Sequence, residues 1–278
     1  MDTEHDKNSV FREVDRLGWI GHCEWFDTID STNLVAKRWL NECAGLATEL
    51  PAVFVSNEQT FGRGRGGNQW WSPSGCLMLT LVIPSSVLPP DVGDWSQLAL
   101  VVGVALADVA EQAVTPQTSV QLKWPNDLYL EGKKCGGILI ESHTDPSGEQ
   151  FWLIGIGTNV RVNLDQAPQE VRNRATTLGL HQATDAPRLS VEGIFLDLLC
   201  ALRHWILGWG QGELSWQQPW SARCLLHGKE VWVRIPGDRE VRGACDGVDS
   251  TGRLIVRNSA GVELITSGEI IRWESFPT

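Results

Sequence analysis

Apolar residues occur in short runs, separated by polar segments or by segments rich in glycine and proline. Short runs of Val, Ile and Leu that are closed by turn residues are typical of buried strands. We therefore expect strands at 52–56, 77–83, 120–123, 137–141 and 151–156, with turns at Pro125 and Gly132. Helical patterns mix with these runs without a regular βαβ alternation, which predicts an α+β body built on a mixed sheet.

Three segments combine helical spacing with capping residues. Asp30-Ser31-Thr32-Asn33 precedes LVAKRWL and is typical of a capped helix start. Asp94, with Gln97 three positions later, predicts the N-cap of a helix that extends to about Gln112. Ser190 opens the third helix, whose apolar face we predict to be Phe195, Leu198, Leu199, Leu202, Trp205, Ile206 and Trp209.

After Gly210 the pattern changes to short strands joined by turns. We expect strands at 231–235, 241–248, 254–256 and 262–265, with hairpin turns at Gly237-Asp238 and Thr251-Gly252. This spacing predicts a small C-terminal β-barrel. We place the boundary so that residues 1–221 form the body and residues 222–278 form the small domain.

Charge supports this division and restricts the function. The 278 residues include 34 acidic and 23 basic side chains, for a net charge of −11. Residues 222–278 carry eight of each sign, so the whole net charge falls on residues 1–221. Because phosphate binding needs a basic face, this balance argues against a protein that coats nucleic acid. A local basic site in the acidic body remains compatible with it.

Cysteine usage and the apolar runs predict a cytoplasmic protein. Seven cysteines are scattered without a Cys-x-x-Cys pair, which argues against a zinc ribbon or a thioredoxin-type motif. The start, MDTEHDKNSV, lacks the apolar segment of a secretion signal. No apolar run reaches the ~20 residues that a membrane span needs.

Residues 61–75 carry the strongest chemical signal, in the sequence FGRGRGGNQWW. The glycines fit G-x-G-x-x-G, but Pro73 and Gly75 prevent the helix that a dinucleotide fingerprint must open. A P-loop is excluded because no Gly-Lys-Ser/Thr follows. Arg63 and Arg65 on a glycine-rich loop can instead hold carboxylate or phosphate oxygens. A solvated surface loop is the simpler alternative.

A second candidate lies in Lys123-Trp124-Pro125-Asn126-Asp127. The turn at the proline presents Asn126 and Asp127 at a strand end, where their oxygens could hold Mg²⁺. An ordinary Asn-Asp turn is an equally good interpretation. We expect the following turn to bring Lys134 back beside Asp127, with Gly136 and Gly137 clearing space. Asn159, at the tip of GIGTN, is a candidate on the next strand.

Together these motifs resemble those of the biotin–protein ligases. They are Asp30-Ser31-Thr32-Asn33, Gln59 with GRGRGG, Trp70, KWPND, Lys134-Cys135-Gly136-Gly137 and GIGTN. The resemblance implies a class II synthetase-like catalytic fold, with a mixed sheet and flanking helices, and an SH3-like C-terminal barrel. About 24 residues precede the pattern, fewer than a helix-turn-helix repressor domain needs. The chain therefore resembles the monofunctional type, without an N-terminal DNA-binding domain.

The resemblance also implies the reaction. Biotin would be activated with Mg·ATP as biotinoyl-AMP, and then transferred to a lysine of the biotin carboxyl carrier domain of acetyl-CoA carboxylase. ATP and Mg²⁺ are thus the expected cofactors, biotin the substrate and the carrier protein the partner, without nucleic acid or membrane. Whether the enzyme is a monomer or a homodimer stays open.

Roles for individual residues follow only from the resemblance. Catalytic roles fall on Arg63, Arg65, Lys134 and Asp127. The biotin site would comprise Ser31, Thr32, Gln59, Gly62, Arg63, Lys134 and Gly137. The nucleotide would contact Arg65, Trp70, Asn126 and Asn159. No protein ligand is assigned to a metal, because Mg²⁺ would be carried by the ATP phosphates.

Two alternatives remain. A lipoate–protein ligase or octanoyltransferase shares the fold and the acyl-to-lysine chemistry, although GRGR and KWPND favour biotin. A non-catalytic biotin-sensing module is the other alternative. Asp127 and Lys134 together with the arginine pair argue against it, because a pure binder needs no nucleotide site.

Overall fold

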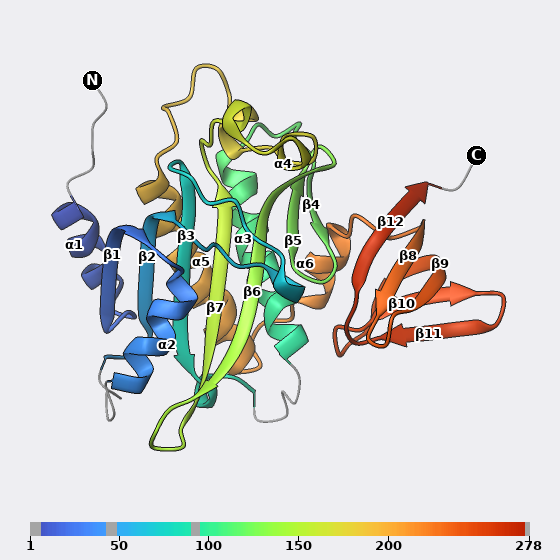
Figure 1. The fold of residues 1–278 in the computed structure, drawn as a ribbon, viewed down its shortest axis with the longest axis horizontal. Helices are drawn as coiled ribbons and strands as arrows, with labels where there is room; N and C mark the ends of the chain where they lie inside the picture. The colour runs from blue at the N-terminus through green and yellow to red at the C-terminus, as the bar shows by residue number, and fades with distance from the viewer. Residues whose placement is uncertain (1–6, 43–48, 90–94, 276–278) are drawn as a thin grey trace.

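The computed structural model describes residues 7–42, 49–89 and 95–275. They form a helix-flanked seven-stranded sheet and, beside it, a separate five-stranded sheet formed by the C-terminal residues (Figure 1). The predicted α+β class, with a mixed sheet, flanking helices and a C-terminal β-sheet, is confirmed. Within these ranges no helix combines the length and apolar character that crossing a membrane requires.

The large sheet has the order β1-β2-β3-β7-β6-β5-β4. Its strands are β1 His22–Ile29, β2 Ala52–Gln59, β3 Cys76–Pro84, β4 Val120–Lys123, β5 Asp127–Leu130, β6 Lys133–Thr144 and β7 Gln150–Asn159. Only β1 and β2 pair in parallel, because helix α2 Thr32–Glu42 connects them as a crossover. All other neighbours are antiparallel and are joined by turns or longer connections.

Helices cover the two faces of this sheet unequally. Helices α3 Trp95–Ala113 and α5 Val191–Gly210 lie together behind it, and α1 Lys7–Leu17 packs against α5 (Figure 1). On the front, α2 packs over β2, β3 and β7. Successive side chains of β2 point to opposite faces of the sheet. Val53 and Val55 pack in the core behind the sheet, and Phe54 packs in the smaller core under α2 on the front. The front face beyond α2 is therefore free to form a site.

The predicted helix α5 is confirmed in detail. Ser190 is its N-cap, and its Oγ accepts a hydrogen bond from Gly193 N at 2.9 Å. The predicted apolar face, including Phe195, Leu198, Trp205 and Trp209, is buried in the main core. Asp94, the predicted cap of α3, lies outside the described residues.

The C-terminal sheet has the order β11-β10-β9-β8-β12 and is antiparallel throughout, consistent with an SH3-like domain. Its strands are β8 Lys229–Ile235, β9 Arg239–Val248, β10 Leu254–Asn258, β11 Gly261–Ile265 and β12 Glu269–Ser275. At the first hairpin turn Asp238 has φ of 58°, next to Gly237 at 84°. The boundary proposed between residues 221 and 222 falls at the end of helix α6 Gln217–Ala222.

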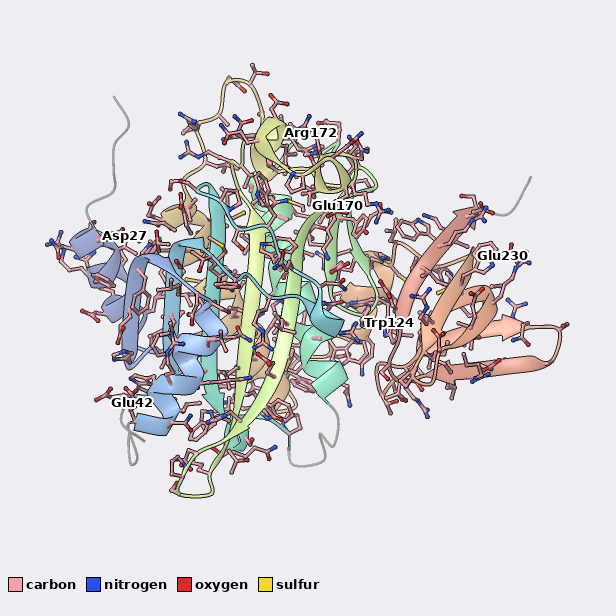
Figure 2. The ribbon with its side chains drawn as sticks, viewed as in Figure 1. Asp27, Glu42, Trp124, Glu170, Arg172 and Glu230 are labelled. Atoms are coloured by element: carbon pink, nitrogen blue, oxygen red, sulfur yellow. The ribbon has the colours of Figure 1, made fainter. Side chains whose placement is uncertain are left out.

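Strand β4 pairs with the segment that leads into the C-terminal sheet, and Trp124, just after β4, bonds to a turn of that sheet. Leu122 N donates to Arg223 O at 2.7 Å, and Leu225 N donates to Leu122 O at 2.9 Å. The next residue but one, Trp124, is 1% exposed, and its Nε1 donates to Gly252 O in the β9–β10 turn at 3.1 Å. Figure 2 labels Trp124 at this junction. The KWPND segment therefore anchors the C-terminal sheet as well as bordering the front face.

Among the described α-helices and strands, six were not predicted: β1, β5, β12, α1, α4 Gln169–Arg172 and α6. Each has a weak or interrupted apolar pattern. β1 (HCEWFDTI) has no fully buried residue, and β12 (EIIRWES) carries charges along its length. β5 has four residues and follows directly on the proline turn. Asp127 is consequently the first residue of a strand rather than part of the turn.

Candidate functional site

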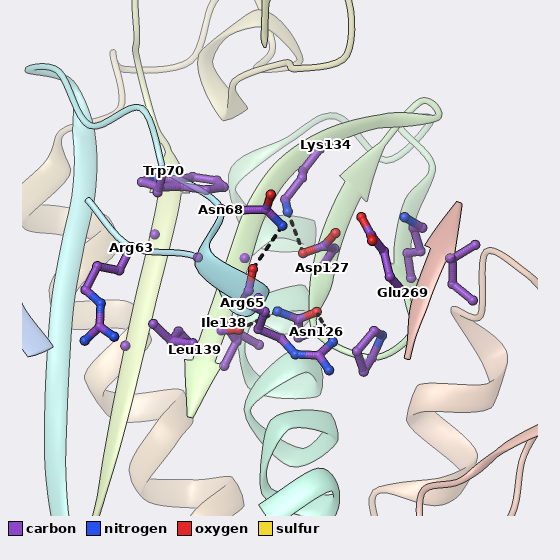
Figure 3. Close-up of a pocket in the computed structure, with 18 of the residues that line it drawn as sticks. Arg63, Arg65, Asn68, Trp70, Asn126, Asp127, Lys134, Ile138, Leu139 and Glu269 are labelled. Carbon is purple, nitrogen blue, oxygen red and sulfur yellow. Dashed lines mark hydrogen bonds and ion pairs between the residues drawn. The ribbon is translucent and has the colours of Figure 1, made fainter. Parts of the chain in front are cut away.

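A cavity of about 1190 Å³ opens on the front of the large sheet. The glycine-arginine loop, defined as residues 61–75, forms one wall, and β6 and β7 form the floor (Figure 3). The KWPND segment and strand β12 of the C-terminal sheet close the far end. Both sheets therefore contribute to one site.

The glycine-arginine loop is folded back on itself. Arg63 and Gln69 form an isolated bridge, Gly64 N donates to Asn68 O at 2.7 Å, and Asn68 N donates to Arg65 O at 3.2 Å. Gly66, at the tip, has φ of 64°, a left-handed conformation that favours glycine. Only a three-residue 3₁₀ turn occurs in this loop, so the structure agrees with rejecting the dinucleotide fingerprint.

One end of the cavity is lined by buried neutral polar groups. Ser31 and Thr32, at the start of α2, are 3% and 4% exposed. The Thr32 backbone N donates to Gln59 Oε1 at 2.7 Å, and its hydroxyl lies 3.2 Å from the same oxygen. Gln59 Nε2 in turn donates to Ser72 Oγ at 3.3 Å, which ties α2 to the glycine-arginine loop. These groups offer hydrogen bonds without net charge.

Charged groups occupy the other end. Lys134 Nζ lies 2.6 Å from Asp127 Oδ1, as the turn between them predicted (Figure 3). Gly137 faces Asp127 across the β5–β6 pair, and a side chain there would contact both charged groups. Lys134 Nζ also lies 5.4 Å from the centre of the Trp70 ring. Glycine thus keeps the ion pair open towards the cavity.

Arg65 extends into the same end. Its Nη1 lies 3.4 Å from Asn126 Oδ1, while Asn126 Nδ2 donates to Ile138 O at 2.5 Å. Burial lowers the pKa of Arg65, and the nearby charges of Asp127 and Glu269 oppose that shift. The guanidinium stays charged, because an arginine side chain is not deprotonated in proteins. Its partial desolvation strengthens any contact with an anion.

The Trp70 ring lies against the floor of the cavity at Gly157. A side-chain carbon at Gly157 would sit 2.7 Å from its ring, so only glycine allows this approach. Among the atoms of the described residues, Trp70 Nε1 is buried and has no hydrogen-bond partner. The ring is therefore held close to β7, and its faces can contact a ring of the substrate.

The C-terminal sheet supplies groups that the sequence did not identify. Lys123 Nζ lies 4.7 Å from the Trp273 ring centre and 5.7 Å from that of Tyr129. These two rings meet edge to face at 6.0 Å, across the junction of the sheets. Burial lowers the pKa of Lys123, against the opposing charges of Asp127 and Glu269. The adjacent WPND letters could have pointed to Lys123, whereas no local signal marks Trp273 or Glu269.

Most of the predicted site residues meet in this cavity. Those that line it are Ser31, Thr32, Gln59, Arg63, Arg65, Trp70, Asn126, Asp127, Lys134 and Gly137. Gly62 is not among the lining residues; a side chain there would collide with Ser72 Oγ and the carbonyl of Trp70, so it shapes the loop from behind.

Asn159 is also outside the lining. It is 5% exposed, accepts from Cys76 Sγ at 3.4 Å and donates to Thr176 O at 3.0 Å. It therefore braces the end of β7 from below. Among the described residues, no group of three or more His, Cys, Asp or Glu side chains could hold a metal ion.

Comparison with known families supports the same interpretation of both sheets. Residues 25–159 match the model of the biotin/lipoate A/B protein ligase family. Residues 226–273 match the model of the biotin protein ligase C-terminal domain. The first match contains all the sequence motifs, and the second contains the five-stranded sheet except the last two residues of β12.

Relatives resemble the chain over most of its length. The biotin–[acetyl-CoA-carboxylase] ligase of Paracoccus denitrificans is 34% identical over 87% of this chain and 96% of its own. The enzyme of the same name from Mycobacterium tuberculosis is 32% identical over 88% of each chain. The structure also superposes on a biotin protein ligase from Aquifex aeolicus in complex with biotin and ATP, with a TM-score of 0.72 and 26% identity. That match covers 91% of this chain and 99% of the other.

Proposed function

Because this chain belongs to the biotin–protein ligase family, we propose that it activates biotin with ATP and transfers it to a protein lysine. The acceptor we propose is the carboxyl carrier domain of acetyl-CoA carboxylase, as the names of the relatives indicate. The observation that carries the proposal is one cavity with two different ends: buried neutral hydrogen-bonding groups bordered by Arg63 line one, and Arg65 and the Lys134–Asp127 ion pair line the other. We name them the biotin end (Ser31, Thr32, Gln59, Arg63) and the nucleotide end (Arg65, Asn126, Asp127, Lys134).

In the first step a carboxylate oxygen of biotin attacks the α-phosphorus of ATP. The new P–O bond gives biotinoyl-AMP, and the bond to the bridging oxygen breaks to release pyrophosphate. Two anions must approach each other, so cations at the meeting point lower the barrier. We assign this role to Arg65 and Lys134, which line the nucleotide end, and assign Arg63 to the biotin end.

In the second step the amine of the acceptor lysine attacks the carbonyl carbon of the mixed anhydride. An amide bond forms, the bond to the phosphate oxygen breaks, and AMP leaves. The attacking amine must lose a proton, and we assign to the Asp127 carboxylate the role of orienting the amine and accepting that proton. Lys134 stabilises the developing negative charge on the departing phosphate oxygen.

Binding contacts divide in the same way. A ureido ring requires fixed hydrogen-bond partners, which the Thr32 and Gln59 side chains and Ser31 supply at the biotin end. Gly137 leaves room above the sheet for the substrate chain. Trp70 offers a flat face to a ring, and Lys123 and Trp273 extend the nucleotide end into the C-terminal sheet.

Mg²⁺ fits this arrangement as an ion that arrives with ATP. Side-chain oxygens at the nucleotide end include those of Asn126, Asp127 and Glu269, and Asp127 already pairs with Lys134. Such a sparse set suits a metal that keeps its water and phosphate ligands. When bound, Mg²⁺ would neutralise phosphate charge.

Measuring pyrophosphate release with biotin or lipoate, each with ATP and Mg²⁺, tests the first step. We expect release with biotin and none above background with lipoate. Transfer of labelled biotin to a purified carrier domain tests the second step, with a carrier domain whose acceptor lysine is replaced by arginine as the control. Absence of both activities, in protein that is shown to be folded, would overturn the proposal. Binding without pyrophosphate release would indicate a sensor.

A further inference from the structure

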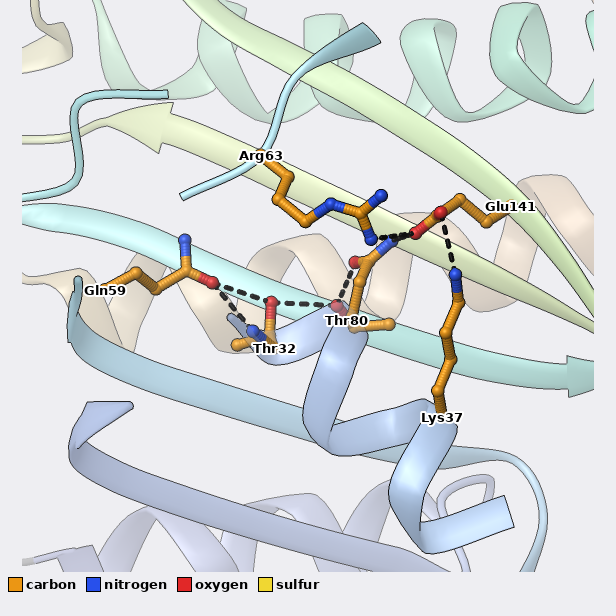
Figure 4. A network of polar contacts seen from close by, with 7 residues as sticks. Thr32, Lys37, Gln59, Arg63, Thr80 and Glu141 are labelled. Carbon is orange, nitrogen blue, oxygen red and sulfur yellow. Dashed lines mark hydrogen bonds and ion pairs between the residues drawn. The ribbon is translucent and has the colours of Figure 1, made fainter. Parts of the chain in front are cut away.

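The carboxylate of Glu141, on β6, receives donors from two other segments of the chain (Figure 4). Lys37 Nζ lies 2.8 Å from Oε1, Asn33 Nδ2 donates to Oε2 at 2.8 Å, and Arg63 Nη1 lies 3.3 Å from Oε2. Lys37 and Asn33 belong to α2, whereas Arg63 belongs to the glycine-arginine loop. Glu141 does not line the cavity, so it can act on a substrate only through these partners.

Glu141 is built to remain charged. Burial by itself would raise its pKa, but hydrogen bonds from Lys37 and Asn33 and the charge of Arg63 outweigh burial and hold the pKa below its ordinary value. Its side chain is only 19% exposed. Hydrogen bonds to a shielded, ionised carboxylate are stronger than those between neutral groups. These three contacts can therefore hold Lys37, Asn33 and Arg63 at fixed positions relative to β6.

One partner relays this anchor into the biotin end. Asn33 is 3% exposed, and its Oδ1 accepts a hydrogen bond from the Thr80 hydroxyl at 2.5 Å. The same hydroxyl lies 2.8 Å from Thr32 Oγ1, which contacts Gln59 (Figure 4). A side chain at Gly155 would collide with the Asn33 amide, so the floor of the sheet is glycine where Asn33 lies. A continuous polar chain thus leads from Glu141 to the residues at the biotin end.

The third partner is held more loosely. Arg63 makes the longest of the three contacts, and its side chain is 40% exposed, against 27% for Lys37. Because Lys37 and Asn33 already satisfy both oxygens of Glu141, the carboxylate stays paired when Arg63 moves. The glycine-arginine loop is therefore tethered to a fixed point by a contact that can be broken and remade.

We propose that Glu141 is a positioning residue that sets the spacing between Arg63 of the loop and the start of α2, and thereby sets biotin affinity. This inference rests on the proposed function and extends it to a residue outside the cavity. Two halves of the biotin end come from segments far apart in sequence, and Glu141 joins them. Its role concerns how tightly biotin binds, not the chemistry at phosphorus.

The first experiment replaces the charge and keeps the shape. In Glu141→Gln we expect the KM for biotin in pyrophosphate release to rise about tenfold, the equivalent of about 1.4 kcal/mol. The KM for ATP and kcat should stay close to wild type. Glu42→Gln is the matched control, because Glu42 lies on α2 but is exposed. A biotin KM equal to wild type in Glu141→Gln would overturn the inference.

A double-mutant cycle tests whether Glu141 acts through Arg63. If it does, adding Glu141→Gln to Arg63→Ala should raise the biotin KM much less than Glu141→Gln does alone. Fully independent effects would mean that Glu141 does not position Arg63. Such a result overturns the inference while leaving the proposed function intact, because wild-type activity is measured in the same series.

A readout without substrate completes the test. Trypsin cleaves after arginine, and the tether restrains Arg63, so Glu141→Gln should be cut faster at Arg63–Gly64, as followed by mass spectrometry. Unchanged cleavage there would count against the tether. If Glu141→Gln is too unstable to assay, Glu141→Asp serves instead, since it keeps the charge but is one methylene too short. It should shift the biotin KM in the same direction, and an unshifted value would again overturn the inference.

Discussion

The two ends of the cavity are built on opposite plans. At the biotin end, Ser31, Thr32 and Thr80 are nearly inaccessible to solvent, and Thr32 and Thr80 form a connected hydrogen-bond network with Asn33 and Gln59. At the nucleotide end, the Lys134 side chain is 33% exposed and pairs with an acid on the neighbouring strand. The biotin end belongs to one sheet and its helix, whereas the nucleotide end is completed by the C-terminal sheet.

This difference follows from what each end must recognise. A neutral ring gives little electrostatic attraction, so selectivity requires donors and acceptors whose positions are fixed before binding. Phosphates carry strong charge, and cations that exchange partners can follow that charge as bonds form and break. Changes at the biotin end should therefore alter biotin KM, and changes at the nucleotide end should alter the rate or ATP KM.

The largest effect is expected for Lys134→Ala. Removing this cation should lower kcat for pyrophosphate release about 10³-fold, because a charge-stabilising donor next to the reacting phosphorus is lost. Biotin affinity, measured by calorimetry, should change little. Lys229→Ala, at the start of β8 and outside the cavity lining, is the control. A near-normal rate of pyrophosphate release by Lys134→Ala would contradict the catalytic role assigned to Lys134.

Gly155→Ala should damage the biotin end selectively. The added carbon meets the Asn33 amide, and overpacking of this kind costs about 1–3 kcal/mol of stability. Displaced Asn33 should also raise the biotin KM, with the ATP KM unchanged. Gly103→Ala on α3 is the matched control, since its nearest contact would be an ordinary 3.6 Å to Leu122. A larger change in the ATP KM than in the biotin KM would contradict the division of the cavity into a biotin end and a nucleotide end.

Trp273→Ala probes the contribution of the C-terminal sheet. Loss of the ring beside Lys123 removes a cation–π contact, which we expect to raise the ATP KM about tenfold without changing the biotin KM. Trp273→Phe keeps an aromatic face and should remain near wild type. An unchanged ATP KM in the alanine variant would show that the nucleotide end is complete without this contact.

The smallest effect concerns pH. The folded-state pKa of Glu141 is depressed, so its stabilisation is complete above the ordinary value of 4.5 and is lost as the pH falls through the lower folded pKa. The free-energy difference between wild type and Glu141→Gln should thus be constant near neutral pH and shrink in acid. Urea denaturation of both proteins at several pH values measures it. A difference that grew in acid would have the wrong sign for a charged Glu141.

Local signals predicted the parts of the site that depend on short segments. Glycines and arginines within one loop, and a proline turn followed by Lys134, determine their own geometry through backbone constraints. The apolar spacing of α5 and the short C-terminal strands likewise determined their structure. Strands β1 and β12 escaped prediction because they lie at sheet edges, or border the cavity, and do not show an uninterrupted apolar pattern.

Long-range contacts could not be predicted in this way. Asn33 and Glu141 are 108 positions apart, and Trp124 and Gly252 are 128 apart. Neither pair forms a motif, since register in the sheet and the docking of the second sheet decide which residues meet. For Asn159 a local signal was misleading. Its place at the end of a strand made it a candidate for the site, but its side chain is buried and forms hydrogen bonds with Cys76 and Thr176 instead.

The junction on β4 has a consequence for how this chain can be recombined. Leu122 and Trp124 hold the C-terminal sheet, and the residues that immediately follow them, Asn126 and Asp127, belong to the nucleotide end. A chimera that received its C-terminal sheet from a relative would exchange the far wall of the cavity at the same time. Although the two sheets are separate in topology, they share one site. A chimera should therefore keep its activity only when the contact residues on both sides of the junction are exchanged together.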